Sequence, residues 1–295
     1  MDMQSVSIIG VGRIGGALAL ALSRAGYRVI NLVYRNAENL SKVVQAVPQP
    51  TLISSTELAD LRTDIIFITA PDPEIESIAD QLSTILTGTP IVLHTSGSLS
   101  SIVLSKLVAI GCNAGSIHPL LSVSDPFRGA ERFAGAYFCV EGDDQAVSAA
   151  KKIASDLGGA PFTIETRLKP LYHASAVTAC GHLVALIDIA LEMLAKCGVE
   201  SEQGSKMLLP LIRSTVENLQ TQTTAQALTG TFARADVAAF NRHLGLLREN
   251  VSIQAHDIYL DLGLRSLALA ERQGADIEDI ELIRKEIAIA KLKTG

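Results

Sequence analysis

The feature that most constrains this chain is the glycine-rich stretch at residues 5–20, SVSIIGVGRIGGALAL. A short apolar run leads into three glycines with the spacing G-x-G-x-x-G, and an Ala/Leu-rich segment with helical periodicity follows at once. In such a turn the first glycine permits a tight bend, the second lets a pyrophosphate approach the backbone, and the third allows close packing of helix on strand. The unpaired N–H groups at the start of the helix attract phosphate. The stretch therefore predicts a dinucleotide-binding unit whose phosphate contacts are Gly10, Val11, Gly12, Arg13, Ile14 and Gly15.

The first part of the chain alternates segments typical of strands and of helices. The expected strands are short apolar runs at Val6–Gly10, Arg28–Tyr34, Thr51–Ser54, Asp64–Ala70, Ile91–Thr95, Asn113–Ile117, Ala136–Val140 and Phe162–Glu165. The expected helices between them are Gly15–Ala25, Ala37–Ala46, Glu74–Leu86, Ser98–Ile110 and Asp144–Leu157. Apolar strands that alternate with helices indicate a parallel sheet buried on both faces. Because the last three strands lie close together in sequence, we expect the sheet to end in a mixed or antiparallel part.

After about Thr166 the pattern contains only helical periodicity. The expected helices are Lys169–Cys197, Glu202–Leu219, Arg234–Leu247, Asn250–Gln273 and Ile277–Lys291, with Gly198 ending the first and Asp276 capping the last. We therefore predict an α/β Rossmann domain over residues 1–166, followed by an all-α substrate and dimerisation domain over residues 167–295. The long apolar helix Lys169–Cys197 is the spine of that domain, a dimer contact, or both.

Composition narrows the class of protein. The 295 residues are 48% apolar and carry a net charge of −6, with no Trp and no basic run, so we expect neither a nucleic-acid nor a membrane partner. The four cysteines show no CxxC spacing, which is typical of a reducing compartment. The N-terminus lacks a signal-peptide pattern, and no uninterrupted apolar run approaches the roughly 20 residues that span a bilayer. We expect a soluble, cytoplasmic protein.

The residues that follow the second, fourth and fifth strands should line the nucleotide site. The second strand ends at Tyr34-Arg35-Asn36, where NAD-binding units place a carboxylate for the ribose 2′-hydroxyl. A guanidinium pairs with a 2′-phosphate instead, so Arg35 favours NADP over NAD, although it could simply solvate the end of the strand. Strand ends of a parallel sheet share one edge, which adds the following expected contacts: Thr69, Ala70, Pro71, His94, Thr95 and Ser96.

Three polar clusters are candidates for the chemistry. His94-Thr-Ser-Gly97 and Ser116-Ile-His118 each follow a strand, and Lys169 and His173 share one face at the start of the long helix. We predict that Lys169 faces the cleft and donates a proton, and that His118, His94 and His173 position the substrate or carry the proton. Each histidine could equally be a hydrogen-bonded structural group. No carboxylate or cysteine lies near them at ligand spacing, so we expect no metal.

The remaining predicted contacts concern the substrate. Ser96, Gly97 and His118 follow strands at the expected crevice. Arg234 could bind a substrate carboxylate through a bidentate pair, or could serve as a helix-start charge or a dimer contact. We therefore expect a small substrate that bears a carboxylate.

These motifs, in this order, resemble one family. The glycine turn, His94-Thr-Ser-Gly97, Gly115-Ser-Ile-His-Pro119, Lys169-Pro-Leu-Tyr-His-Ala174 and Leu228-Thr-Gly…Ala-Arg-Ala-Asp236 are similar to those of Rossmann-like candidate NADP oxidoreductases of the 6-phosphogluconate dehydrogenase-like group. The resemblance implies an all-helical C-terminal domain and a homodimer with intertwined helical domains. Some relatives are alternative ketopantoate reductases. In the wider group, β-hydroxyacid dehydrogenases carry a catalytic Lys with Asn four residues later; Lys169 matches the Lys, and His173 stands at the Asn position.

We therefore predict an NADP-dependent dehydrogenase or reductase that acts on a CH–OH or C=O group of a small 2-keto or 3-keto acid. The best single substrate is ketopantoate (2-dehydropantoate), which would be reduced to pantoate. Two alternatives remain: an imine reductase of the pyrroline-5-carboxylate reductase type, and a non-catalytic NADP-binding regulatory protein.

Overall fold

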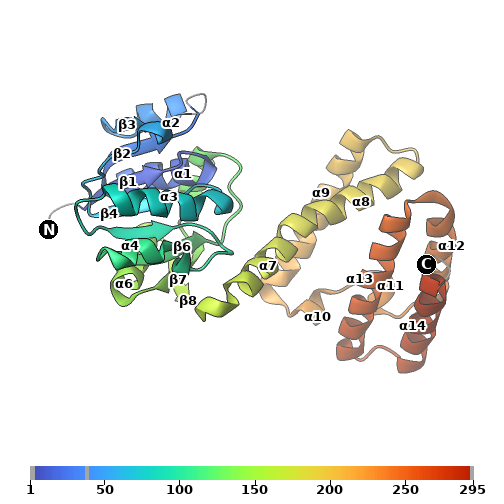
Figure 1. The fold of residues 1–295 in the computed structure, drawn as a ribbon. Helices are drawn as coiled ribbons and strands as arrows, with labels where there is room; N and C mark the ends of the chain where they lie inside the picture. Colours follow the sequence, from blue (N-terminus) through green and yellow to red (C-terminus); the bar gives the residue numbers. More distant parts are fainter. Residues whose placement is uncertain (1–3, 37–39, 293–295) are drawn as a thin grey trace. The chain divides into compact units, whose positions relative to one another are not determined.

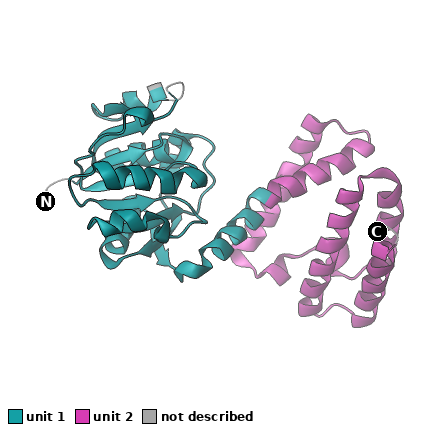
Figure 2. Cartoon of the chain, in the orientation of Figure 1, with its two compact units in different colours: residues 1–181 teal, residues 182–295 magenta. Residues whose placement is uncertain are grey.

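The chain, seen here as a computed structural model, divides into two compact units, residues 1–181 and residues 182–295 (Figure 2). The structure describes residues 4–36 and 40–292. The first unit extends through helix α7 (Lys169–Ala179). The predicted boundary after residue 166 coincides with the change from strands to helices. That it also separates two functional domains stays a prediction.

The first unit is built on one sheet of eight strands in the order β3-β2-β1-β4-β5-β6-β7-β8 (Figure 1). The strands are β1 (Ser5–Ile9), β2 (Arg28–Tyr34), β3 (Thr51–Ser54), β4 (Ile65–Ile68), β5 (Ile91–His94), β6 (Asn113–Pro119), β7 (Tyr137–Gly142) and β8 (Ala160–Thr163). All neighbours pair in parallel except β6 and β7, which are antiparallel. The predicted Rossmann-like sheet, with its mixed end, is confirmed.

Helices cover both faces of this sheet. The helices of the first unit are α1 (Arg13–Arg24), α2 (Leu40–Ala46), α3 (Asp72–Ile85), α4 (Ser105–Ala109), α5 (Pro126–Arg132), α6 (Asp144–Asp156) and α7, with the short 3₁₀ turns η1 (Ser55–Glu57), η2 (Ser101–Leu104) and η3 (Thr166–Leu168). Apolar side chains of α1, α2 and α6 form one core with one face of the sheet, and those of α3 and α4 form a second core with the other. All four residues of β4 are buried, as expected of a strand covered on both sides.

Several elements of the first unit differ from the sequence-based prediction. Helix α5 was not predicted; it begins at Pro126 after the cap Asp125, whose carboxylate accepts hydrogen bonds from the N–H groups of Phe127 and Arg128. Only residues 101–109 of the helix predicted at Ser98–Ile110 are helical, first as η2 and then as α4. The last strand lies two residues earlier than expected. The start of the helix predicted at Ala37–Ala46 falls partly outside the described residues.

The second unit contains only helices and turns in its described part, which confirms the predicted all-α region. They are α8 (Gly181–Lys196), α9 (Ser201–Thr221), α10 (Thr224–Ala227), α11 (Gly230–Ala233), α12 (Val237–Asn250), α13 (Ile253–Gln273) and α14 (Ile277–Leu292). Its core is an apolar cluster of α12, α13 and α14. Asp276 caps α14 by accepting hydrogen bonds from two backbone N–H groups, and Gly198 follows α8 with φ +82°, as predicted. The short helices α10 and α11 were not predicted.

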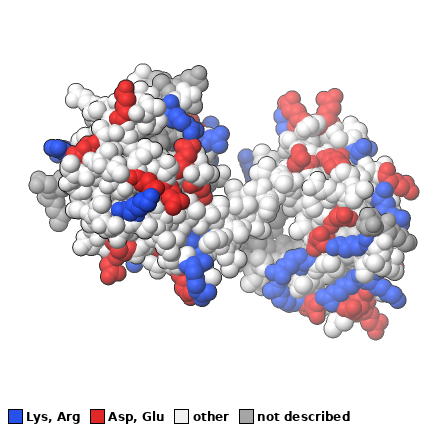
Figure 3. Space-filling view, in the orientation of Figure 1, with Lys and Arg blue, Asp and Glu red and all other residues white. Residues whose placement is uncertain are grey.

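The long helix predicted at Lys169–Cys197 is two helices, α7 and α8, because the backbone at Cys180 departs from helical geometry (φ −116°, ψ −64°). None of the residues of α8 is buried within the chain. Figure 3 shows few charged side chains along this region, whereas both signs of charge are interspersed over the rest of the visible face.

The segment 166–196 meets the length and composition criteria of a membrane-spanning helix. Its most apolar window has a mean hydropathy of 1.8, and that window is unburied within the chain. The predicted absence of a long uninterrupted apolar run does not exclude such a segment. The prediction required an uninterrupted apolar run, but isolated polar residues such as His182 and Asp188 leave the mean hydropathy high. Partner-facing helices of water-soluble proteins have the same composition.

Candidate active site

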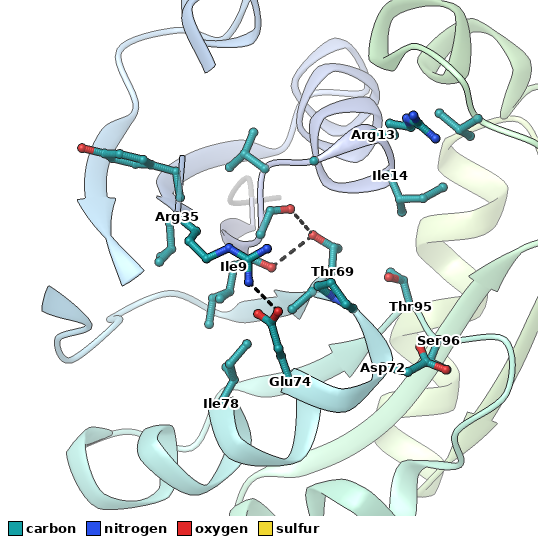
Figure 4. A pocket seen from close by; sticks show the side chains of 18 of the residues that line it. Ile9, Arg13, Ile14, Arg35, Thr69, Asp72, Glu74, Ile78, Thr95 and Ser96 are labelled. Carbon is teal, nitrogen blue, oxygen red and sulfur yellow. Dashed lines mark hydrogen bonds and ion pairs between the residues drawn. The ribbon is translucent and has the colours of Figure 1, made fainter. Parts of the chain in front are cut away.

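A cavity of about 630 Å³ lies at the carboxyl ends of strands β1, β2, β4 and β5 (Figure 4). The strand order reverses between β1 and β4, and in open α/β sheets ligands bind at such a reversal. The lining includes the glycine turn, the residues after β2 and β4, and a group made of Thr95, Ser96, Gly97 and His118. The cavity therefore lies where the sequence predicts a dinucleotide.

The glycine turn has the geometry that a pyrophosphate requires. Gly10 has φ +97°, and a Cβ there would lie 3.0 Å from the backbone of Thr69 and Ala70. A Cβ on Gly15 would lie 2.1 Å from the Gly10 carbonyl oxygen and 2.3 Å from Thr69 Oγ1, so helix α1 could not pack against the turn. At Gly12 a Cβ would meet no described atom within 4 Å, so the space beside this backbone is open to the cavity. No side chain of a described residue caps α1, which leaves the first N–H groups of this helix for an anion.

At one end of the cavity the Arg35 guanidinium forms an ion pair with Glu74, with Nη1 and Oε1 2.5 Å apart (Figure 4). Arg35 follows β2, and Glu74 lies in the first turn of α3. Both side chains are substantially exposed, at 71% and 41%. Sequence reasoning identified Arg35 and missed Glu74, because the two residues meet only when β2 and α3 reach the same edge of the sheet.

At the other end of the cavity two imidazoles converge on Gly97. A Cβ on Gly97 would lie 2.6 Å from His173 Cδ2 and 2.8 Å from His118 Nε2, so only glycine allows both rings this close. The two ring centroids are 6.0 Å apart. His118 belongs to β6 and His173 to α7, so the fold brings together two predicted residues that are far apart in the sequence.

His118 also borders a second cavity of about 450 Å³. His173 and Leu121 line this second cavity as well, together with Ala176 and other residues of α7. His118 and Leu121 are shared with the first cavity, so His118 lies where the two cavities adjoin. This arrangement leaves room for a small second ligand next to a nucleotide, with an imidazole at the junction.

The surroundings of His118 hold its imidazole neutral. Burial, His173 and the Lys169 ammonium lower the pKa of His118 to about 4. Its Nδ1 lies 2.8 Å from the Tyr172 hydroxyl, and burial raises the pKa of that hydroxyl, so Tyr172 stays protonated. A neutral imidazole carries one proton; when Tyr172 donates to Nδ1, that proton is on Nε2, the atom beside Gly97.

Lys169 is not among the described residues that line either of these two cavities. Its ammonium is fully buried, donates to Ser116 Oγ, and lies 3.1 Å from Glu141 Oε1. Burial lowers the pKa of Lys169, and Glu141 opposes that shift. Lys169 lies in the first turn of α7, close to β6 and β7, where Glu141 binds it, and its predicted orientation toward a cleft between the domains stays a prediction. Its part in catalysis stays a prediction.

Glu141 is the centre of a buried polar network. Its carboxylate accepts hydrogen bonds from Ser116 Oγ at 2.7 Å, from the Ser101 N–H and hydroxyl at 2.8 Å each, and from Lys169. Burial opposes ionisation of Glu141, but the Lys169 ammonium and these hydrogen bonds outweigh it and lower its pKa. The network joins β6, β7, α7 and the turn η2 that follows Gly97. It therefore holds the elements that carry His118, His173 and Gly97.

His94 is buried, and it is not among the described residues that line either cavity. Its Nδ1 accepts a hydrogen bond from the Ser96 N–H at 3.2 Å. Burial and the Lys169 ammonium lower the pKa of His94 to about 3, so the ring is neutral. The hydrogen bond at Nδ1 ties His94 to the loop after β5, and its predicted role at the site stays a prediction.

Apart from His173, which lines the smaller cavity, the predicted site residues fall into three groups. The first lines the larger cavity and comprises Gly10, Val11, Gly12, Arg13, Ile14, Tyr34, Arg35, Asn36, Thr69, Ala70, Pro71, Thr95, Ser96, Gly97 and His118. The second group does not line it: Gly15 packs against the glycine turn, and His94 and Lys169 are buried. Arg234 stands apart: it ends α11 in the second unit, and its predicted role as a carboxylate anchor stays a prediction.

Sequence reasoning missed Glu74, Tyr172 and Glu141. Tyr172 lies directly before His173, and the hydrogen bond to His118 could not be read from that position. Glu141 is a charged residue at the end of an otherwise apolar strand, which is the kind of signal that marks a buried partner for Lys169.

Two domain families match the sequence. A Rossmann-like domain matches residues 2–119, and a domain of unknown function, DUF2520, matches residues 136–266. No curated protein matches the chain in sequence.

Solved structures match the fold over nearly the whole chain. Protein TM1727 from Thermotoga maritima is 22% identical, with a TM-score of 0.70 over 91% of this chain and 99% of that one. A candidate NADP oxidoreductase from Bacteroides fragilis is also 22% identical, with a TM-score of 0.72 over 90% and 98% of the two chains. Pyrroline carboxylate reductase from Plasmodium falciparum, solved with NADP bound, is 17% identical, with a TM-score of 0.58 over 92% and 99%. At sequence identities this low, the similarity shows a shared fold alone.

Proposed function

The chain combines a Rossmann-like domain with a DUF2520 domain, and from this premise we propose that it is an NADP(H)-dependent oxidoreductase that reduces a small carbonyl or imine compound. The observation that carries the proposal is the position of His118, a neutral imidazole at the junction of a nucleotide-sized cavity and a smaller one. The fold is also shared with reductases that act on such bonds, among them the pyrroline carboxylate reductase with NADP bound.

The residues of the larger cavity fit a nicotinamide dinucleotide. The open backbone at Gly12 and the uncapped start of α1 would hold the pyrophosphate, and Arg35 would meet the 2′-phosphate. Thr95, Ser96 and Gly97 line the same cavity toward His118. When bound there, the reduced nicotinamide supplies the hydride for the reaction.

The protein groups in this reaction handle the proton and the position of the substrate. We assign the proton to His118 Nε2: it donates a hydrogen bond to the substrate oxygen and gives up its proton as that oxygen gains negative charge, which leaves an imidazolate until a proton returns to the ring. His173, next to His118, would return a proton from solvent. The buried Lys169–Glu141 pair would act by positioning β6 and α7, rather than by donating the proton itself.

A small keto acid is the substrate class that we propose, with ketopantoate as the first compound to test. The second cavity, at about 450 Å³, has room for a compound of that size. Arg234 stays the residue that the sequence predicts for the carboxylate. Imine reduction is the second candidate, because a neutral imidazole at the same place can also donate to a nitrogen, and related folds include imine reductases.

The test combines nucleotide binding with turnover. Wild type should bind NADPH, detected by nucleotide fluorescence, and oxidise it when ketopantoate or a cyclic imine is added. His118→Gln should retain NADPH binding and lose about 10²–10⁴-fold in turnover, the usual contribution of general acid catalysis. His243→Gln, in the second unit and outside both cavities, is the matched control. NADPH binding with no oxidation of any keto acid or imine would favour the regulatory alternative, and an active His118→Gln would overturn the role of His118.

We also propose that a second copy of the chain covers the apolar face of α8 and α9, as the family resemblance implies. Val184 on α8 is 67% exposed and Leu211 on α9 is 63% exposed, and no residue of α8 is buried within the chain. A patch of this kind marks an interaction surface. Light scattering after gel filtration should give twice the mass of the chain, and the Val184→Glu variant should have the mass of a single chain. A monomeric wild type that binds lipid vesicles would contradict the dimer and point to a membrane.

A further inference from the structure

The end of the proposed nucleotide site that would hold the adenosine ribose contains a cation and an anion, which favour different nucleotides. A guanidinium after β2 suits the 2′-phosphate of NADP, and a carboxylate in the same region suits the 2′-hydroxyl of NAD. Here Arg35 follows β2, and the Glu74 carboxylate, from helix α3, lies 2.5 Å from its guanidinium in the same cavity (Figure 4). Among the described residues, the carboxylate that lies beside Arg35 is thus contributed by α3.

We propose that Glu74 sets the selectivity between NADPH and NADH: it weakens the preference for NADPH that Arg35 confers and allows the chain to use either nucleotide. The inference rests on the proposed function, since it requires that a nicotinamide dinucleotide occupies this cavity.

The electrostatics of the pair support this role. A 2′-phosphate that approaches Arg35 must displace or share its ion pair with Glu74, and the two anions then repel each other at a few ångströms. The pair can be displaced, because both side chains are exposed and exposed pairs contribute only about 0–1 kcal/mol. The uncharged 2′-hydroxyl of NADH meets no such repulsion, and it can donate a hydrogen bond to the carboxylate.

The position of Glu74 distinguishes it from Asp72, the other acidic residue among the described residues that line the cavity. Asp72 also lines the cavity, but in Figure 4 the side chain that points to Arg35 is that of Glu74. Glu76, two residues further along α3, is exposed and is not among the described residues that line the cavity. Glu76→Gln therefore removes one negative charge from the same helix, as Glu74→Gln does, but at a side chain that does not pair with Arg35.

The experiment measures the dissociation constants of NADPH and NADH by nucleotide fluorescence for wild type, Glu74→Gln and Glu76→Gln. In Glu74→Gln we expect NADPH to bind about fivefold more tightly and NADH to bind less tightly, because repulsion is removed and a charged acceptor is lost. The ratio of the NADH constant to the NADPH constant should rise about tenfold. In Glu76→Gln the ratio should stay at the wild-type value.

The outcomes separate this inference from the function on which it rests. If wild type binds neither nucleotide, the proposed function fails, and the role of Glu74 fails with it. If wild type binds a nucleotide but the ratio is unchanged in Glu74→Gln, or changes equally in Glu76→Gln, only the role of Glu74 is overturned. A double variant, Arg35→Gln/Glu74→Gln, should lose most of the gain in NADPH affinity, because the repulsion matters only where Arg35 draws the phosphate in.

Discussion

Two ion pairs of the first unit contain the same kinds of charge in opposite surroundings. Arg35 and Glu74 lie at the rim of the larger cavity and are exposed at 71% and 41%. Lys169 and Glu141 lie inside the protein, at 0% and 3%, with every carboxylate oxygen hydrogen-bonded. An exposed pair is stabilised weakly and can exchange partners, whereas a buried pair is costly to break. The first pair is therefore suited to meet a ligand, and the second to hold the elements around the site.

The largest effect should follow from breaking the buried pair. Lys169→Met leaves the Glu141 carboxylate buried without its cation, and we expect the free energy of unfolding to fall by about 3–5 kcal/mol. Denaturant titration measures it. Lys106→Met is the matched control, because Lys106 pairs with Asp80 on the surface, and its loss should cost less than about 1 kcal/mol. Equal losses in the two variants would contradict the distinction between buried and exposed pairs.

A smaller effect should follow from pH, because the buried surroundings of Lys169 also hold His94 neutral. The pKa of His94 is about 3 in the folded protein, against 6.5 for a free histidine. As the pH falls below 6.5, the unfolded chain takes up a proton that the folded protein does not, so stability is present above 6.5 and decreases below it. Between pH 7 and pH 5 we expect a loss of about 2 kcal/mol from this residue.

Denaturant titrations at pH 7, 6 and 5 test this expectation, with His94→Asn as the comparison. The variant should show a shallower decrease in stability than wild type over the same interval. Parallel decreases in the two proteins would mean that other groups carry the pH dependence.

The smallest effect on stability should come from the exposed pair. Arg35→Gln should change the free energy of unfolding by no more than about 1 kcal/mol, because both partners remain solvated. The same variant should bind NADPH distinctly more weakly. A large loss of stability would show that Arg35 has a structural role and would remove the contrast with Lys169.

Much of the fold and of the nucleotide site could be predicted because the signals are local. The glycine turn specifies its own backbone: the positive φ of Gly10 and the close contact of Gly15 with the Gly10 carbonyl each require glycine at that position. Apolar runs at strand length predicted the eight strands, and these placed Thr69 and Ser96 at the same edge of the sheet. The helices that were missed, such as α5 and α10, are short and have little periodicity to detect.

The arrangement of the residues around His118 was harder to predict, because it depends on contacts between residues that are far apart in the sequence. His118 and His173 were identified as candidates, but their approach at Gly97 depends on how α7 packs beside β6. Lys169 was expected to face the cleft because helical spacing places it on one face with His173. Spacing does not say what that face meets, and in the folded chain the first turn of α7 meets Glu141.

The sequence by itself determined how strands and the longer helices alternate along the chain, the phosphate-binding turn and the position of Arg35 after the second strand. Each of these depends on residues that are neighbours along the chain. Tertiary structure alone decided that Glu74 pairs with Arg35, that Glu141 buries the charge of Lys169, and that His118 lies between two cavities. These features depend on the distance and solvent exposure of charged groups contributed by different elements. Both quantities are set by packing, and they decide whether a charge binds a ligand or supports the fold.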